Sequence, residues 1–177
     1  MIGVLVSGEG TNLQALVDAG LAIGAVASNR ADAPALGRAE AAGIPNRSFE
    51  LDRYAGRGAR DRDMADWLEL RGVDLVVLAG YMHLLTHAFL DRFPDRIVNV
   101  HPSLLPEFPG ARAIDDALAA GAETTGVTVH YVDEGLDTGA VIRQESVAVE
   151  PRETLVERIH AVEHRILPEV VRELCAR

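Results

Sequence analysis

The chain has 177 residues, of which 48% are hydrophobic and 25% charged, a length and composition that fit one globular domain and exclude a fibrous or disordered protein. Its 17 basic and 27 acidic residues give a net charge of −10, which disfavours general nucleic-acid binding. Every basic residue is an arginine, and the absence of lysine excludes Schiff-base chemistry and a Walker-type phosphate loop.

Strand-like apolar runs alternate with helical stretches over the first part of the chain. Strands are predicted at residues 2–6, 22–28, 47–51, 73–79 and 97–100, and helices at 11–19, 34–42, 60–71, 86–93 and 113–120. Two long strands at 126–132 and 140–149 then predict an antiparallel pair, followed by one long helix at 153–175 that contains Pro168.

This order of elements predicts an α/β, single-domain, Rossmann-like fold. Repeated strand–helix alternation implies a mostly parallel sheet with flanking helices, to which the late antiparallel strands and the long C-terminal helix are added. Ligands of such sheets bind outside the carboxyl ends of the strands. That rule directs attention to residues 7–12, 80–85, 99–110 and 133–139.

No apolar run reaches the roughly 18 residues of a membrane span, and the first residues lack the basic start of a signal peptide. Cys175 is the only cysteine, so neither an intrachain disulfide nor a cysteine-rich zinc site is expected. These features predict a protein of the reducing cytoplasm that does not contact a membrane.

A glycine turn follows the first strand, in the sequence VSGEGTNL at residues 6–13. Gly8 and Gly10 allow a tight turn, and the backbone N–H groups of Gly10, Thr11 and Asn12 would face an anion at a helix N-terminus. The third glycine of a dinucleotide fingerprint is replaced by Leu13. A phosphate monoester is the ligand that fits best, while a turn that needs glycine for packing explains the same pattern.

Asn99 and His101 end a buried strand, and the two-residue period puts them on one side of it. An amide and a protonated imidazole can both donate to a carbonyl oxygen that gains charge, which suits acyl transfer. Asp137 would orient the imidazole if its loop folds over the strand end, and His130, on the same strand face as Thr128, could point to the same site. A structural hydrogen bond, a plain hairpin loop, and a metal site of His101, His130 and Asp137 remain alternatives.

The final predicted helix carries His160, Glu163 and His164 at spacings that share one face. A solvated polar stripe explains this pattern. Acceptance of hydrogen bonds from sugar hydroxyls by Glu163 is the functional alternative.

Five segments carry a resemblance when they are taken together: SGEGTNLQAL, SNRADAPAL, LAGYMHLL, NVHPSLLPEFPG and DEGLDTGAVIRQ. In this order and spacing they resemble the phosphoribosylglycinamide formyltransferases, also called glycinamide ribonucleotide transformylases, of the folate-dependent formyltransferase family. The resemblance covers nearly the entire chain. It implies transfer of the formyl group of 10-formyltetrahydrofolate, a co-substrate, to the amine of N1-(5-phospho-D-ribosyl)glycinamide in purine biosynthesis, without a metal.

The resemblance also implies an organisation and a set of site residues. One formyltransferase domain would span residues 1–177, with a phosphate-binding Rossmann-like half at 1–100 and a catalytic and folate-loop half at 101–177. Catalysis would use Asn99, His101 and Asp137. The ribonucleotide would contact Gly10, Thr11, Asn12, His160 and Glu163. The folate would contact Arg57, Met82, His83, Leu84, Leu85, Asn99, Asp133, Glu134, Gly135, Leu136 and Asp137.

Two positions depart from the family pattern: His83 stands where an arginine is common, and Arg112 where a histidine is frequent. The HPSLLP and GLDTG segments also occur in related enzymes that handle formyl groups. A 10-formyltetrahydrofolate deformylase and a non-catalytic module that binds a folate or a phosphate ligand therefore remain alternatives. The expected partners are small-molecule substrates, with no nucleic acid and no membrane, and a monomer and a homodimer both fit the sequence.

Overall fold

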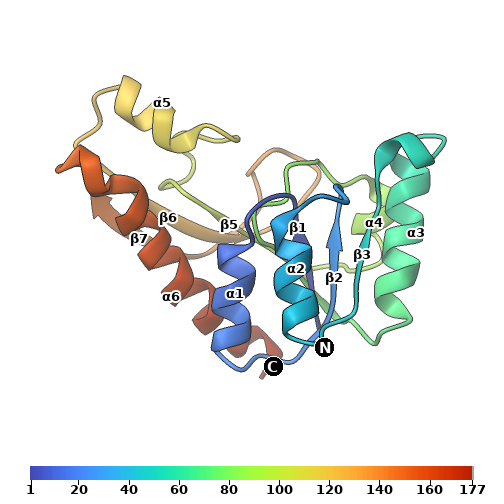
Figure 1. Cartoon of the computed structure of the whole chain (residues 1–177). Coiled ribbons are helices and arrows are strands. Elements are labelled where there is room, and N and C mark those ends of the chain that lie inside the picture. Colours follow the sequence, from blue (N-terminus) through green and yellow to red (C-terminus); the bar gives the residue numbers. More distant parts are fainter. Residues whose placement is uncertain (177) are drawn as a thin grey trace. The chain divides into compact units, whose positions relative to one another are not determined.

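The computed structural model describes residues 1–176, and it has the α/β architecture that the sequence predicts (Figure 1). Seven strands follow the order β3-β2-β1-β4-β5-β6-β7. The chain divides within β5 into two compact units, Met1–Val98 and the residues from Asn99 onward. The prediction of a mostly parallel sheet with antiparallel late strands and a long C-terminal helix is confirmed.

The first unit contains parallel strands that are mostly apolar, apart from the short polar strand at Asn46–Ser48. They are β1 (Ile2–Val6), β2 (Ile23–Ser28), β3 (Asn46–Ser48) and β4 (Leu75–Leu78). β1 pairs in parallel with both β2 and β4, and β2 pairs with β3. Every residue of β1, β2 and β4 is buried, as expected where helices cover both faces of a parallel sheet.

The helices of the first unit are α1 (Thr11–Asp18), α2 (Pro34–Ala41), α3 (Arg57–Glu69) and α4 (His87–Leu90). α1 lies beside α2, and α3 lies against α4 (Figure 1). α4 is shorter than the predicted helix at 86–93, because Pro94 disfavours helical conformation in the residue before it. The predicted strand at 47–51 is also wrong in extent: β3 ends at Ser48, opposite the last residue of β2, and a 3₁₀ helix, η1, follows at Leu51–Arg53.

The second unit begins within β5 (Ile97–His101) and continues through α5 (Ala113–Ala119), β6 (Thr124–Tyr131), β7 (Val141–Ala148), the 3₁₀ helix η2 (Arg152–Thr154) and α6 (Leu155–Cys175). α6 lies against β6 and β7 (Figure 1). Its buried aliphatic side chains are Leu155, Ile159, Ile166, Leu167, Val170, Val171 and Leu174. Burial of each such side chain stabilises the fold by roughly 1.5–3 kcal/mol. None of the helices in the described residues is both long and apolar enough to cross a membrane.

Gly126 allows β6 to approach two neighbouring segments closely. It pairs with Ser146 of β7. A Cβ atom at position 126 would lie 2.2 Å from the backbone oxygen of Glu145 and 2.6 Å from the side chain of Leu104. Because one of these neighbours is backbone, a methyl group cannot be accommodated without moving the strand or the segment that follows β5.

We therefore expect Gly126→Ala to lower the free energy of unfolding by about 1–3 kcal/mol through overpacking. The matched control is Gly37→Ala in α2, where no atom lies within 4 Å of the added methyl group. Alanine is favoured over glycine inside a helix, so this variant should be more stable by roughly 0.5–1 kcal/mol. Urea unfolding of both variants is the measurement, and wild-type stability in Gly126→Ala would contradict the packing argument.

Candidate active site

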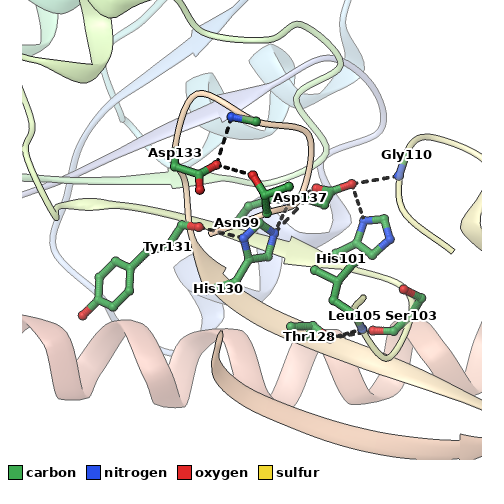
Figure 2. Close-up of polar contacts among 12 residues, drawn as sticks. Asn99, His101, Ser103, Leu105, Gly110, Thr128, His130, Tyr131, Asp133 and Asp137 are labelled. Atoms are coloured by element: carbon green, nitrogen blue, oxygen red, sulfur yellow. Dashed lines mark hydrogen bonds and ion pairs between the residues drawn. The ribbon is translucent and has the colours of Figure 1, made fainter. Parts of the chain in front are cut away.

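The end of β5 and the neighbouring part of β6 carry the polar side chains of the candidate site (Figure 2). Asn99 is half-buried, and His101 has a side chain only 5% exposed. Thr128 and His130, two residues apart on β6, are also buried. The pairing of β6 with β7 shifts register between Val129 and His130, an irregularity of the kind that re-aims side chains beside functional sites.

The carboxylate of Asp137 gathers four groups around it (Figure 2). Its Oδ1 accepts a hydrogen bond from Nδ2 of Asn99 at 3.4 Å and lies 3.6 Å from Nε2 of His130. Its Oδ2 accepts from the backbone N–H of Gly110 at 2.8 Å and lies 3.4 Å from Nδ1 of His101. The three side chains that the sequence predicts as a catalytic set are therefore neighbours in space.

Two opposing effects set the pKa of Asp137. Burial alone would raise it, because a buried carboxylate loses hydration. The hydrogen bond from His130, the N–H of Gly110 and the charges of His101 and His130 act in the other direction and together hold the pKa of Asp137 below its ordinary value. The carboxylate is therefore ionised at neutral pH.

The loop at residues 133–139 fixes the direction of this carboxylate. Asp137 has φ 54°, a left-handed conformation that aspartate tolerates better than most residues. Earlier in the loop, Oδ1 of Asp133 accepts from the N–H of Gly135 at 3.0 Å and from the hydroxyl of Thr138 at 2.6 Å. These local bonds close the loop and turn Asp137 toward β5, so the loop is more than a plain hairpin connection.

The ring nitrogens of the two histidines have defined partners. Nδ1 of His130 donates to the backbone oxygen of Tyr131 at 2.7 Å, and its Nε2 lies 3.2 Å from Nδ2 of Asn99. Nε2 of His101 donates to the backbone oxygen of Phe108 at 2.8 Å. Phe108 has φ 51°, which is rare for a bulky residue and directs its carbonyl at the ring.

The segment that follows His101 is held by a second polar cluster on β6 and β7. The hydroxyl of Thr128 donates to the backbone oxygen of Ser103 at 2.7 Å and accepts from the N–H of Leu105 at 3.1 Å. Gln144 donates to the same hydroxyl at 2.9 Å and to the oxygen of Leu105 at 2.8 Å. Thr128 therefore supports the backbone around the site instead of pointing a free hydroxyl into it.

The metal-site alternative finds no geometric support in residues 1–176, where no group of three or more His, Cys, Asp or Glu side chains is arranged to hold an ion. The imidazoles of His101 and His130 lie near separate oxygens of Asp137.

The glycine turn lies in the first unit and precedes α1. Gly10 has φ 73°, and a Cβ atom there would lie 2.9 Å from Cα of Ala35, so both conformation and contact require glycine. The backbone N–H groups of Gly10 and Thr11 meet no acceptor within the described chain, while Nε of Arg38 binds the oxygen of Glu9 at 2.7 Å. The turn thus offers unpaired donors at a helix N-terminus.

Residues 82–85, also in the first unit, present apolar side chains and unpaired backbone. Met82 and Leu84 are 62% and 47% exposed, whereas Leu85 is buried. None of the backbone N–H or C=O groups of residues 83–85 forms a hydrogen bond inside the described part of the chain. Arg57, the first residue of α3, is exposed.

The polar residues that the sequence predicts on one face of α6 differ in how deeply they are buried. Glu163 is buried and His160 is exposed, and the rings of His160 and His164 stack at 6.0 Å. Burial and then the neighbouring charge of His160 lower the pKa of His164. A solvated stripe does not describe Glu163.

Three contributions are ones that the sequence did not reveal. The N–H of Gly110 and the carbonyl of Phe108 act through the backbone, so no side-chain pattern could identify them. Arg38 approaches the glycine turn from α2, where it donates to the oxygen of Glu9 and to the side chain of Gln14. Gln14 is 24 residues away in the sequence, so no local pattern joins the two. The only signal in the sequence was that residues 108–110 follow closely after the HPSLLP segment. That position indicated the loop, but it did not indicate which of its backbone groups take part.

Comparison with known proteins identifies the family of this chain. The model of the family described as formyl transferase matches residues 1–171. The chain belongs to the formyl transferase family. The resemblance that its sequence motifs predict is thereby confirmed.

Relatives of this formyl transferase are closely similar to it along its length. The phosphoribosylglycinamide formyltransferase of Bacillus subtilis is 39% identical over 97% of this chain and 92% of the relative. The trifunctional purine biosynthetic protein adenosine-3 of Drosophila pseudoobscura pseudoobscura is 43% identical over 94% of this chain, which spans only 13% of that protein. The solved structure of glycinamide ribonucleotide transformylase 1 from Symbiobacterium toebii is 47% identical, has a TM-score of 0.94, and is matched over 97% of this chain and 85% of its own.

The pKa of Asp137 leads to a prediction about acid stability. Because its folded-state pKa lies below the unfolded value, Asp137 contributes stability that is present above the unfolded pKa, ordinarily about 3.9, and is lost as pH falls through the folded pKa. Asparagine tolerates the left-handed backbone but carries no charge. Urea unfolding of the formyl transferase and its Asp137→Asn variant should give a stability gap that is widest near neutral pH and narrows below about pH 4. A gap independent of pH would contradict this electrostatic account.

Proposed function

We propose that this formyl transferase moves the formyl group of 10-formyltetrahydrofolate to the amine of N1-(5-phospho-D-ribosyl)glycinamide, a step of purine biosynthesis. The observation that carries the proposal is the carboxylate of Asp137 beside Asn99 and His101, in a chain that matches the family over nearly its whole length. Relatives of similar length that are named phosphoribosylglycinamide formyltransferase support the choice of substrates.

The ribonucleotide is assigned to two groups of residues. Gly10, Thr11 and Asn12 receive its phosphate, because the turn before α1 offers backbone N–H donors at the positive end of a helix dipole. His160 and Glu163 receive its ribose, because a buried carboxylate is a strong acceptor for sugar hydroxyls. Because the chain has no lysine, backbone N–H groups, arginine or histidine must hold this anion.

The folate is assigned to the segments that expose apolar side chains and backbone. Met82, His83, Leu84 and Leu85 form one such segment, and Arg57 supplies a cation for a carboxylate of the ligand. The second segment is the loop of Asp133, Glu134, Gly135, Leu136 and Asp137, in which Leu136 is 51% exposed. Asn99, which hydrogen-bonds to Asp137, completes the assignment.

The chemistry assigned to the three polar side chains is acyl transfer. The neutral amine attacks the formyl carbon, and negative charge builds on the formyl oxygen. Asn99 and protonated His101 donate to that oxygen, while Asp137 stabilises the imidazolium. The attacking nitrogen then loses a proton, the bond from the formyl carbon to the folate nitrogen breaks, and that nitrogen gains a proton through His101 and water. The products are the N-formylated ribonucleotide and tetrahydrofolate.

Without substrate, the donors for this reaction are occupied within the protein. Nδ2 of Asn99 faces Asp137 and His130, and Nε2 of His101 faces the carbonyl of Phe108. Substrate binding must therefore exchange these internal acceptors for the formyl oxygen. Because these donors are already hydrogen-bonded within the protein, the exchange replaces one acceptor by another and leaves no buried donor unpaired.

We extend the proposal to organisation and context. Residues 1–100 act as the phosphate-binding half and residues 101–177 as the catalytic and folate-loop half of one formyltransferase domain. The partners are small molecules and not nucleic acid, in keeping with the net charge of −10. The lone Cys175 supports a reducing cytoplasm. The oligomeric state, monomer or homodimer, is open to sedimentation analysis.

Three variants test the catalytic assignment. Asn99→Ala, His101→Ala and Asp137→Ala should each fold and each lower kcat by about 10²–10³, the loss expected when one donor to a developing oxyanion, or its support, is removed. His87→Ala on the exposed part of α4 is the matched control and should keep full activity. Near-wild-type turnover of His101→Ala would remove the central assignment.

The substrate assignment is tested by the products. With 10-formyltetrahydrofolate alone the enzyme should release little formate, and addition of the ribonucleotide should produce tetrahydrofolate and the formylated ribonucleotide in equal amounts. Rapid formate release at a rate that does not change when the ribonucleotide is added would identify a deformylase instead. Binding of both ligands without turnover would identify a non-catalytic module.

Chelation provides a separate test of the mechanism. The proposed step uses hydrogen-bond donors and proton transfer, and its histidines are engaged by Asp137, Phe108 and Tyr131. Dialysis against excess EDTA, followed by assay in metal-free buffer, should therefore leave activity unchanged. Loss of activity that added Zn²⁺ restores would show that the acid–base assignment is incomplete.

A further inference from the structure

The segment at residues 81–86 is attached to the rest of the first unit by hydrogen bonds at both of its ends. The N–H of Met82 donates to the hydroxyl of Ser7 at 2.9 Å. At the far end, the N–H and the hydroxyl of Thr86 both donate to Oδ2 of Asp61 at 2.8 Å. Between these anchors, His83 is the one side chain of residues 82–84 that turns inward, since Met82 and Leu84 are exposed.

His83 meets a buried ion pair at the start of α3. The side chains of Arg60 and Asp61 are both 0% exposed. Nε and Nη2 of Arg60 bind Oδ1 of Asp61 at 2.9 and 2.7 Å, and Nη1 lies 2.6 Å from Nδ1 of His83. A guanidinium has only donors, so Nδ1 of His83 must be the acceptor, and the proton of the neutral ring sits on Nε2. Nε2 lies 3.2 Å from Nδ2 of Asn29, which is also a donor, so this second contact is not a hydrogen bond in that tautomer.

The surroundings of His83 keep its ring neutral. Burial, and then the charges of Arg60 and Arg57, lower the pKa of His83, while Asp61 acts weakly in the opposite direction. Asn29 is uncharged, and the ring of Tyr81 lies 6.0 Å away. If Nδ1 of His83 became protonated, it would face the Nη1 donor of Arg60 and the bond between them would be lost.

The Arg60–Asp61 ion pair does not depend on the contact with His83. Asp61 has both oxygens filled, one by Arg60 and one by Thr86. The bond from Nη1 to His83 is an additional contact that joins α3 to the middle of the exposed segment. Its effect is to fix where the exposed side chains of Met82 and Leu84 and the unpaired backbone of residues 83–85 are presented.

We propose that Arg60 is a positioning residue which, by donating to the side chain of His83, sets the conformation of residues 82–85 and thereby the affinity for the folate substrate. This inference rests on the proposed function. His83 would then act toward the ligand through its backbone, with its imidazole serving as the acceptor that locks the segment.

The first test compares two replacements of His83 that leave the Arg60–Asp61 pair intact. His83→Leu removes the acceptor, whereas His83→Asn places an amide oxygen near the position of Nδ1 and cannot titrate. His83→Leu should raise KM for 10-formyltetrahydrofolate about tenfold or more, the loss expected for a charge-assisted hydrogen bond, with kcat and KM for the ribonucleotide changed less than about twofold. His83→Asn should restore most of the affinity.

The second test uses arginine variants on the same helix. Arg60→Met should raise the folate KM in the same way, and Arg62→Met, which changes an exposed arginine two residues away, should not. The double variant Arg60→Met with His83→Leu should be no worse than either single change, because both remove one contact. Since Arg60→Met leaves the Asp61 charge buried, urea unfolding is measured alongside, and His83→Leu remains decisive if that variant is unstable.

The third test is the pH dependence of folate binding, measured by calorimetry with tetrahydrofolate so that turnover is not involved. As pH falls from about 8 to about 5.5, the affinity of the wild-type protein for tetrahydrofolate should weaken more than that of His83→Asn, because protonation of His83 breaks its bond with Arg60. Unchanged folate KM in His83→Leu, or equal damage in His83→Leu and His83→Asn, would overturn the inference. Failure of the proposed function is distinct, because wild-type protein would then not transfer a formyl group to the ribonucleotide, whereas failure of this inference leaves that transfer intact.

Discussion

A single carboxylate, that of Asp137, holds the candidate active site together. It is almost enclosed, and it accepts from an amide and a backbone N–H while facing two imidazoles. Taking a carboxylate out of water is unfavourable, so the arrangement is stable only because these donors replace the lost hydration. The left-handed backbone at this residue adds a further local cost, which the closed loop around Asp133 offsets. Together with the carbonyls of Phe108 and Tyr131, this one group sets the orientation of both histidines, and it also contacts Asn99.

The first unit uses a related device to a different end. The carboxylate of Asp61 is fully buried and also fully bonded, to Arg60 on its own helix and to Thr86 at the end of the exposed segment. In the second unit the bonded groups are those assigned to the chemistry. In the first unit they lie behind the surface that we assign to the folate, and they shape it without touching it.

The sequence was sufficient for the features that depend on periodicity. The apolar runs predicted β1, β2, β4 and β5 within a residue or two, and the two-residue period put Asn99 and His101 on one side of β5. It was insufficient where tertiary pairing decides, since β3 ends because β2 ends. The shorter α4 is a different case, because Pro94, which lies just beyond it, was visible in the sequence. The convergence of Asp137 on β5 depends on a loop conformation, and the part played by Arg60 was hidden because an arginine in a charged helix is ordinarily read as solvated.

The all-arginine composition has a consequence for an enzyme whose acceptor is a primary amine. No side chain of this protein is an amine, so none can compete with the ribonucleotide for the activated one-carbon unit or be modified by it during turnover. A guanidinium stays protonated and is a poor nucleophile under the same conditions. The composition alone therefore rules out formylation of a side-chain amine by the enzyme's own reagent.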